Sequence, residues 1–184
     1  MLFILTNLFI GVNMIFFISK VFFVFIILIN NASAIEKKWS KKGQYKDWEV
    51  YAKKEKDICY AIAKPQKMEG EYNIRGRVDV VVALNNNIKN KYYVGFDFGY
   101  PFADNQKVKL TIDNSIEYKI DTFAQTAWIN SSENPNLEIK VIEAMKKGKI
   151  LIAEGTSERG TDTKDYYSLI GFTKAFKKLN DVCN

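Results

Sequence analysis

The sequence contains no histidine and only two cysteines among its 184 residues. Without histidine, the Ser-His and Cys-His catalytic pairs and the histidine-containing metal sites are excluded. Two cysteines do not form a zinc site by themselves, and no glycine-rich phosphate-binding loop is present in a strand-to-helix context. The sequence therefore predicts no metal or other cofactor, and most enzyme classes are disfavoured.

Acidic residues are absent from the first 34 positions, where the only charged side chain is Lys20. Lys20 is followed by the apolar run 21–29 and then by Ala32-Ser33-Ala34. A positive charge, an apolar core and an A-x-A site in this order are typical of a cleaved secretory signal peptide. We therefore predict that residues 1–34 are a signal peptide and that the mature chain begins at Ile35.

This leader is unusually long, because residues 2–18 are also apolar. A translation start at Met14 would give a signal peptide of ordinary length. If the leader were retained, it would be long enough to anchor the protein in a bilayer. The expected location is the periplasm or the medium outside the cell, and membrane association is the alternative if the leader is not cleaved.

The exported part contains both cysteines, Cys59 and Cys183. An even number of cysteines in an oxidising compartment favours a disulfide over free thiols. The exported part is also long enough to bury the core of one domain. Its first residues, 35–46, are lysine-rich and without periodicity, which predicts a flexible lead-in to a single domain over residues 47–184.

Short segments with alternating or continuous apolar residues dominate this domain. In the first of them, Trp48, Val50 and Ala52 alternate with polar side chains, as in a half-buried strand. Polar and glycine-containing turns separate the segments. The expected strands are 48–53, 58–63, 78–84, 92–100, 107–112, 116–120, 123–129, 150–153 and 166–170, with a polar loop at 154–164.

Two other segments repeat apolar residues at helical spacing. Asn134-Pro135 opens the first helix and Gly148 closes it. The second helix follows Gly171 and carries Cys183 on its apolar face. The predicted fold is mainly β, an antiparallel β-sandwich or open barrel with two short helices, the last of them C-terminal.

Six short motifs are spread over the mature chain in a specific order. They are Asp47–Tyr51, Ile58–Ala61, Gly99–Phe102, Ala144–Gly148, Gly155–Thr161 and Tyr167–Ala175. In this order the chain resembles the invasion-associated locus B family of exported alphaproteobacterial proteins. The resemblance implies an envelope protein from a family associated with host-cell invasion in pathogens. Better-known members carry extra cysteines in mid-domain, where this chain has none, so it resembles a shorter, two-cysteine branch.

The motif residues are expected to act mainly through the fold. Gly171 is expected at a tight strand-to-helix junction, and Gly148 is expected to cap a helix. Phe172 is expected to be buried in the core. Trp48 and Trp128 are expected in the core or in an interface. The full set of motif residues is Trp48, Gly99, Pro101, Gly148, Gly155, Ser168, Leu169, Gly171 and Phe172.

Carboxylate pairs are the remaining candidates for catalysis. Asp97 with Asp104, or Glu154 with Glu158, would suit the acid and base of a glycoside hydrolase. Such acids are more commonly solvated side chains on strands and loops. A non-enzymatic protein is therefore expected, with an envelope polysaccharide hydrolase as the alternative.

Lysines are clustered at the start of the mature chain and on the last helix. Lys174, Lys177 and Lys178 are predicted on the solvent face of that helix, and the other cluster is Lys37, Lys38, Lys41 and Lys42. Such clusters suit acidic lipids or lipopolysaccharide, or they serve solubility alone. Export argues against nucleic acid as the partner.

Tyrosines are frequent in the predicted strands, where amphipathic rings could bind a glycan or a peptide. Strand propensity also explains them. They are Tyr51, Tyr60, Tyr92, Tyr93, Tyr100, Tyr166 and Tyr167. The sequence as a whole predicts an exported binding or structural module whose partner is an envelope protein, a lipid or a glycan.

Overall fold

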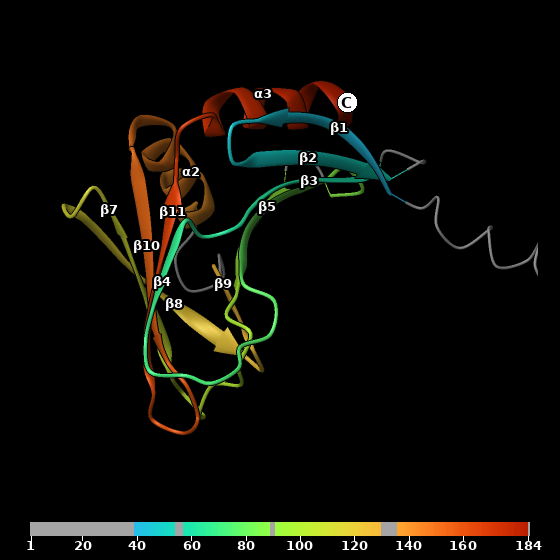
Figure 1. Ribbon diagram of the computed structural model, residues 1–184. Helices are drawn as coiled ribbons and strands as arrows, with labels where there is room; N and C mark the ends of the chain where they lie inside the picture. Colours follow the sequence, from blue (N-terminus) through green and yellow to red (C-terminus); the bar gives the residue numbers. More distant parts are fainter. Residues whose placement is uncertain (1–38, 54–56, 89–90, 130–135, 184) are drawn as a thin grey trace, which may run out of the picture. The chain divides into compact units, whose positions relative to one another are not determined.

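The computed structural model describes residues 39–53, 57–88, 91–129 and 136–183 (Figure 1). The predicted signal peptide, Lys37, Lys38 and Asn134-Pro135 lie outside these residues. Within them, the chain forms one antiparallel sheet of 11 strands in the order β1-β2-β3-β5-β6-β9-β8-β7-β10-β11-β4. The strands are β1 (Trp39–Tyr45), β2 (Trp48–Lys53), β3 (Ile58–Ala63), β4 (Lys67–Glu69), β5 (Asp79–Asn85), β6 (Lys91–Asp97), β7 (Lys107–Ile112), β8 (Ile116–Phe123), β9 (Thr126–Trp128), β10 (Ile150–Thr156) and β11 (Asp162–Ser168).

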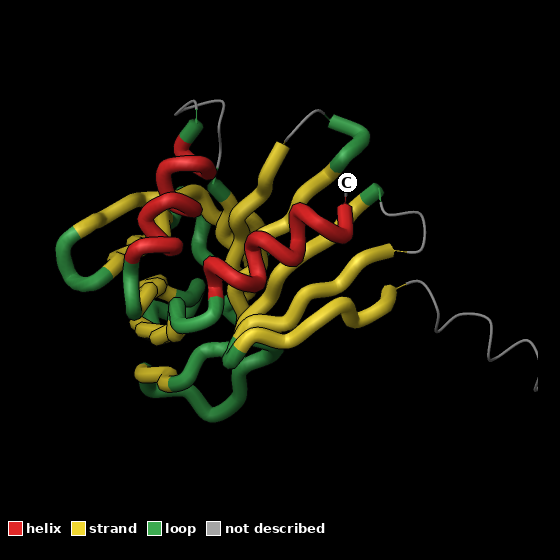
Figure 2. Tube along the Cα trace, turned by 90° about the horizontal axis from the view of Figure 1, so that it is seen from above, coloured by secondary structure: helices red, strands yellow, loops and turns green. Residues whose placement is uncertain are grey.

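Two helices, α2 (Leu137–Lys147) and α3 (Phe172–Cys183), pack on the sheet. Figure 1 shows that β1, β2, β3 and β5 run in one direction and β7, β10 and β11 in another, so the sheet is strongly bent. Seen from above, α3 lies across the first group of strands (Figure 2). Helix α2 contacts α3 and β6. The predicted class is therefore confirmed, with all strands in one open sheet.

The face of the sheet that α3 covers is apolar in β2, β3 and β5. On β2, Trp48, Val50 and Ala52 are fully buried, while the alternate residues are half-exposed. Antiparallel pairing places Val50 opposite Ala61 of β3, and Ala61 opposite Val82 of β5. Because side chains alternate along a strand, this register makes one continuous core face, and no described helix covers the opposite face.

Helix α3 joins the end of the domain to its beginning. Its buried residues Phe172, Leu179 and Cys183 recur at helical spacing, as predicted. The Phe172 ring lies 4.7 Å from the Trp48 ring, and the Trp48 indole N–H donates to the Ser168 carbonyl at 2.9 Å. The predicted partners Cys59 and Cys183 are joined in a disulfide, with Cα atoms 5.8 Å apart.

The junction between β11 and α3 requires glycine at position 171. Gly171 has φ +96°, and a Cβ atom there would lie 2.2 Å from the Tyr45 carbonyl oxygen. A side chain would therefore clash with the backbone in addition to straining its own. This close approach places the start of α3 directly against the turn between β1 and β2.

Helix α2 begins after Asn136 and ends at Gly148, as the spacing predicts. Its inner face buries Val141, Ile142 and Met145. The Gly148 N–H donates to the Ala144 carbonyl at 2.9 Å. Within the described residues, no helix is both long enough and apolar enough to cross a lipid bilayer.

A buried ion pair fixes the loop between β4 and β5. The Arg75 guanidinium donates to both carboxylate oxygens of Asp165 at 2.7 Å and also to the Phe98 carbonyl. The two side chains are only 3% and 0% exposed. Bidentate geometry and the extra carbonyl satisfy charges that would otherwise be costly to bury.

Four segments differ from the sequence-based expectation. The predicted strand 123–129 is interrupted by a turn at Ala124 and Gln125, so that Phe123 ends β8 and Thr126 begins β9. The lead-in was predicted to be flexible, but its residues Trp39–Tyr45 form β1, paired with β2. The predicted loop 154–164 is mostly strand, because β10 extends to Thr156 and β11 starts at Asp162. Strand β4 was not expected. The residues of β1, β4 and the facing ends of β10 and β11 are polar because they lie at a sheet edge or face solvent. Backbone hydrogen bonds hold these residues in the sheet, and such bonds leave no apolar pattern in the sequence.

Candidate binding site on the open face of the sheet

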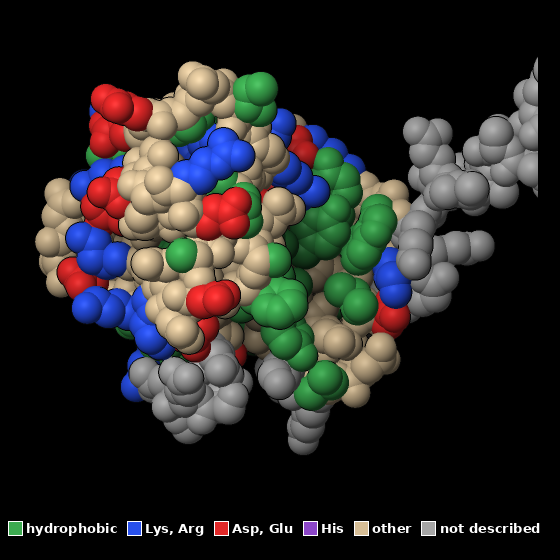
Figure 3. All heavy atoms as spheres, turned by 90° about the horizontal axis from the view of Figure 1, so that it is seen from below, with side chains coloured by type: hydrophobic (Ala, Val, Ile, Leu, Met, Phe, Trp, Pro, Cys, Tyr) green, Lys and Arg blue, Asp and Glu red, His purple; other side chains and the backbone are tan. Residues whose placement is uncertain are grey.

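The uncovered face of β1, β2, β3, β5, β6 and β9 carries a group of partly exposed apolar side chains. We call this surface the open face. Seen from below, hydrophobic side chains gather there in a hollow (Figure 3). The apolar residues that line it are Trp39, Tyr51, Tyr60, Ile62, Val81 and Trp128. Apolar side chains grouped in this way on a surface commonly mark an interaction site.

The strand register sets these side chains in rows. Ile62, Val81 and Gly95 are consecutive cross-strand partners, and Gly95 pairs with Trp128. The next row contains Tyr51 opposite Tyr60. Directly opposite side chains on one face of a sheet are in contact range. The open face is therefore formed by strands that follow one another along the chain from β1 to β6, together with the later strand β9.

Trp128 lies flat on the sheet above Gly95. A Cβ atom on Gly95 would be 2.4 Å from two carbons of the indole ring, so only glycine leaves room for it. The indole N–H donates to the Thr126 hydroxyl at 3.0 Å, and Trp128 is 38% exposed. The ring is thus fixed in orientation and still accessible to a ligand.

A second aromatic group forms the other side of the hollow. The Tyr60 ring stacks on Tyr51 at 5.2 Å, and Trp39 meets Tyr60 edge-on at 4.9 Å. The Tyr51 hydroxyl donates to Glu49 at 2.6 Å, and Lys41 bonds the same carboxylate. The hydrogen bond to Glu49, reinforced by burial, raises the pKa of Tyr51 to about 12.

Three charged residues line the same hollow as these aromatic groups. Asp79 and Asp97 are directly opposite each other on β5 and β6. Asp79 is bonded to the Arg77 guanidinium, and Asp97 accepts the Gly99 N–H at 3.0 Å. Burial raises the pKa of Asp79, the Asp97 charge adds to the rise, and Arg77 opposes it.

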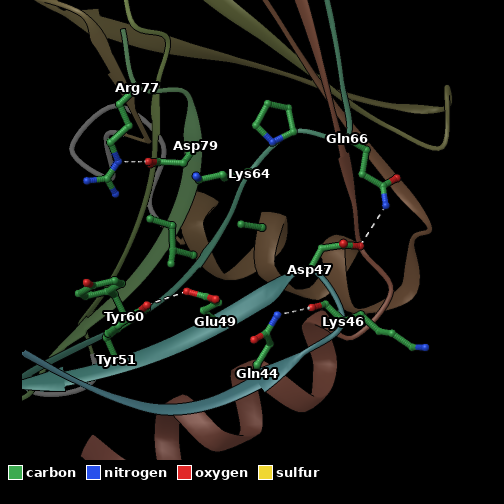
Figure 4. A pocket seen from close by; sticks show the side chains of 13 residues that line it. Gln44, Lys46, Asp47, Glu49, Tyr51, Tyr60, Lys64, Gln66, Arg77 and Asp79 are labelled. Atoms are coloured by element: carbon green, nitrogen blue, oxygen red, sulfur yellow. Dashed lines mark hydrogen bonds and ion pairs between the residues drawn. The ribbon is translucent and has the colours of Figure 1, made fainter.

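Two hollows on the open face share Tyr60, Ile62, Arg77 and Asp79. The one beside Trp128 has a volume of about 320 Å³ and the other about 750 Å³, which is the range of small-molecule sites. In Figure 4 the larger hollow has Arg77, Asp79 and Lys64 on one side and the two stacked tyrosines on another. Rings, carboxylates and a guanidinium suit non-covalent recognition of a polar ligand with an apolar face. Among the described residues, no three metal-ligating side chains form a cluster.

The predicted tyrosines divide between three places. Tyr51, Tyr60 and Tyr93 lie on the open face. Tyr92, Tyr100 and Tyr167 are at least partly inside the fold, and Tyr92 bonds Asn180 of α3 at 2.5 Å. Tyr166 lies elsewhere on the surface and bonds Glu69. The tyrosine count alone therefore overstates the size of the surface.

The predicted carboxylate pairs are arranged differently in the structure. Asp97 has Asp79 as its strand partner rather than Asp104. Glu154 bonds Lys109 and Lys164 at 2.6 and 3.1 Å. Burial acts to raise the pKa of Glu154, but the two lysines outweigh it and lower that pKa. A general acid needs the opposite shift, so Glu154 does not fit that role.

The motif residues are structural in their surroundings. Gly99 lies against Gly76, and Gly155 leaves room for Phe98 and Phe102. The exposed Pro101 accepts the Glu158 N–H through its carbonyl. Ser168 and Leu169 are buried beside the β11–α3 junction.

The predicted anionic-surface lysines remain on the surface. Lys174 and Lys177 are exposed on α3, and Lys178 is half-exposed. Lys41 bonds Gln44 and Glu49. Their contact with an anionic surface stays a prediction.

Sequence reasoning missed Trp39, Ile62, Arg77 and Asp79 as site residues. A signal for the open face was present in β3, which has apolar residues at both odd and even positions. A strand that is apolar on both faces needs two covering layers. In the part of the chain that the structure describes, a helix covers one face and leaves the other available for a ligand.

Fold and site together define a disulfide-closed β protein with one helix-covered face and one open aromatic face. The chain belongs to the family described as Invasion associated locus B (IalB) protein, whose sequence model matches residues 48–180. The fold is similar to the crystal structure of invasion associated protein B from Bartonella henselae, with a TM-score of 0.53 and 19% identity over 78% of this chain and 97% of that chain. At this identity the similarity concerns the fold alone. No curated protein sequence gives a significant match.

Proposed function

We propose that this protein is exported and acts in the cell envelope as a non-enzymatic binding module. Membership of the family supports a role of this kind. The leader pattern before Ile35 supports export, and a disulfide that closes the domain suits an oxidising compartment. N-terminal sequencing of the mature protein should give Ile35, and an intact Met1 or Met14 would refute cleavage.

The open face is the observation that carries this proposal. It combines two partly exposed tryptophans, an apolar floor and a cluster of charged side chains in one hollow. Apolar surface costs free energy when exposed to water, so a partner that covers it gains affinity. The partner is an envelope component, and it binds without a covalent step.

Cross-linking in intact cells tests this directly. A photoreactive phenylalanine analogue replaces Tyr60 on the open face or, as a matched control, the exposed Lys177 on α3. Cross-links that form from position 60 and not from position 177 would support the proposal. Cross-links only from position 177 would move the binding surface to the basic helix, and none from either position would contradict a binding role.

A second candidate, an envelope polysaccharide hydrolase, is favoured by the Asp79–Asp97 pair. Two facing carboxylates, one with a raised pKa, are what a glycoside hydrolase uses as acid and base. Purified protein would be tested for release of reducing ends from peptidoglycan and other envelope polysaccharide. Activity lost in both Asp79→Asn and Asp97→Asn would establish this candidate, and activity unaffected by either substitution would eliminate the pair.

A further inference from the structure

We propose that the open face binds a neutral saccharide chain, with Trp128 as the platform on which a pyranose ring stacks. This inference rests on the proposed binding function and names its ligand class. It follows from three properties of the open face: the flat indole, the adjacent hydrogen-bonding groups and the paired backbone of the strands beneath.

The flat indole is the first property. Gly95 allows the Trp128 ring to lie against the sheet, and Thr126 holds its N–H. One face of the ring is therefore covered and the ligand meets the other. The negative face of an aromatic ring attracts the weakly positive C–H groups on the flat side of a pyranose. A ring that is already fixed loses little conformational entropy on binding.

Hydrogen-bonding groups lie beside the platform. Asp79, Asp97 and Arg77 line the same hollow as Trp128 and Trp39. The Arg77 side chain is 66% exposed, so its guanidinium is accessible to a ligand although Nε bonds Asp79. The terminal N–H groups of Arg77 and the second oxygen of Asp97 are available for bonds to hydroxyl groups of a sugar ring.

Charge argues for a neutral occupant. The carboxylates that line the two hollows are those of Asp47, Glu49, Asp79 and Asp97, and the cations are Lys46, Lys64 and Arg77. An anionic lipid surface would meet four carboxylates, and a strongly cationic ligand would meet three cations. Near-balanced charges in a ring-lined hollow fit a ligand that is rich in hydroxyl groups and carries no net charge.

The backbone argues against an extended peptide. Peptides that bind sheets usually add a strand at an edge, where backbone groups lack partners. Strands β3, β5 and β6 each have a neighbour on both sides, so their backbone is paired under the hollow. Recognition there depends on side chains alone, and a rigid saccharide with a flat apolar side suits such a surface.

Binding of chitohexaose and cellohexaose to the purified, disulfide-bonded protein provides the test. Calorimetry would measure affinity, and tryptophan fluorescence would report on Trp39 and Trp128, because Trp48 is buried. We expect at least one hexasaccharide to bind and Trp128→Ala to weaken it by about tenfold or more. Phe123→Ala is the matched control, since Phe123 is a 77% exposed aromatic outside the hollow. This control should bind like wild type.

Gly95→Ala provides an independent variant that retains the indole but displaces it. It should also weaken binding, and the circular dichroism spectrum of each variant would show that the fold is kept. Absence of binding by both hexasaccharides, or equal loss in Phe123→Ala and Trp128→Ala, would overturn the inference. If position 60 nevertheless cross-links a protein in cells, the binding function stands and its ligand is a polypeptide.

Discussion

Asp79 and Asp97 are direct cross-strand partners on β5 and β6, and both lie in the hollow of the open face. Like charges directly opposite in a sheet repel each other. Arg77 offsets this repulsion from one side through Asp79. Charged groups placed close together in this way are common where they serve function rather than folding.

The raised pKa of Asp79 predicts a specific pH dependence. Its native pKa lies above the ordinary value of 3.8, so the native state binds the proton more tightly than the unfolded state. Stability from this group is therefore present at low pH and is lost as pH rises through the native pKa. Asp79→Asn removes this loss. The melting temperature of the variant minus that of wild type should therefore become more positive as pH rises from about 3 to about 7.

Asp97→Asn is the matched control for this pair. Its amide oxygen can still accept the Gly99 N–H, but the negative charge opposite Asp79 is gone. Carboxyl NMR titration should then show a lower pKa for Asp79 than in wild type. A titration of Asp79 at its ordinary value in wild type would contradict the argument from burial.

Gly171→Ala and Gly160→Ala separate backbone strain from steric clash. Both glycines have positive φ, +96° and +82°, but a Cβ at 160 would meet nothing within 4 Å. Gly160→Ala should therefore cost about 1 kcal/mol. Gly171→Ala adds a clash with the Tyr45 carbonyl and should cost about 3 kcal/mol or more. Urea unfolding measures both, and equal losses would show that the junction relaxes.

Arg75→Ala should destabilise the protein by about 3–5 kcal/mol, because it leaves Asp165 buried without its cation. Arg75→Met with Asp165→Leu should cost less than the single substitution, since no buried charge remains. Lys67→Ala removes an exposed partner of Glu69 and should give no measurable change. Chemical denaturation would measure the free energy of unfolding of each variant. A small loss in Arg75→Ala would mean that water reaches Asp165.

Reduction of the Cys59–Cys183 disulfide should lower the melting temperature. The two cysteines are 124 residues apart, so the cross-link restricts a long loop in the unfolded chain, with an upper effect of about 5 kcal/mol. The double variant Cys59→Ala/Cys183→Ala should melt at the lower temperature and be insensitive to reductant. A reduced wild type that melts unchanged would remove any stabilising role of this bond.

Some elements could be predicted because local pattern and tertiary packing agree. The alternation in β2 and the spacing in α3 identify both elements and their buried faces. Strands β1 and β4 could not be predicted in this way, since pairing with a neighbour holds them and their own side chains are mostly polar. The candidate site could not be predicted from the sequence for a related reason. Trp128 lies on Gly95 because β9 pairs with β6, and this pairing is a property of the topology rather than of either segment.

The position of α3 at the end of the chain has a consequence for the order of assembly. Helix α3 packs on β1, β2, β3 and β5, and these strands are synthesised before the helix. Until residues 172–183 are synthesised, the apolar core face of β2, β3 and β5 is exposed and prone to self-association. Completion of the fold is therefore a late event, because the core face of these strands stays exposed until the last helix docks.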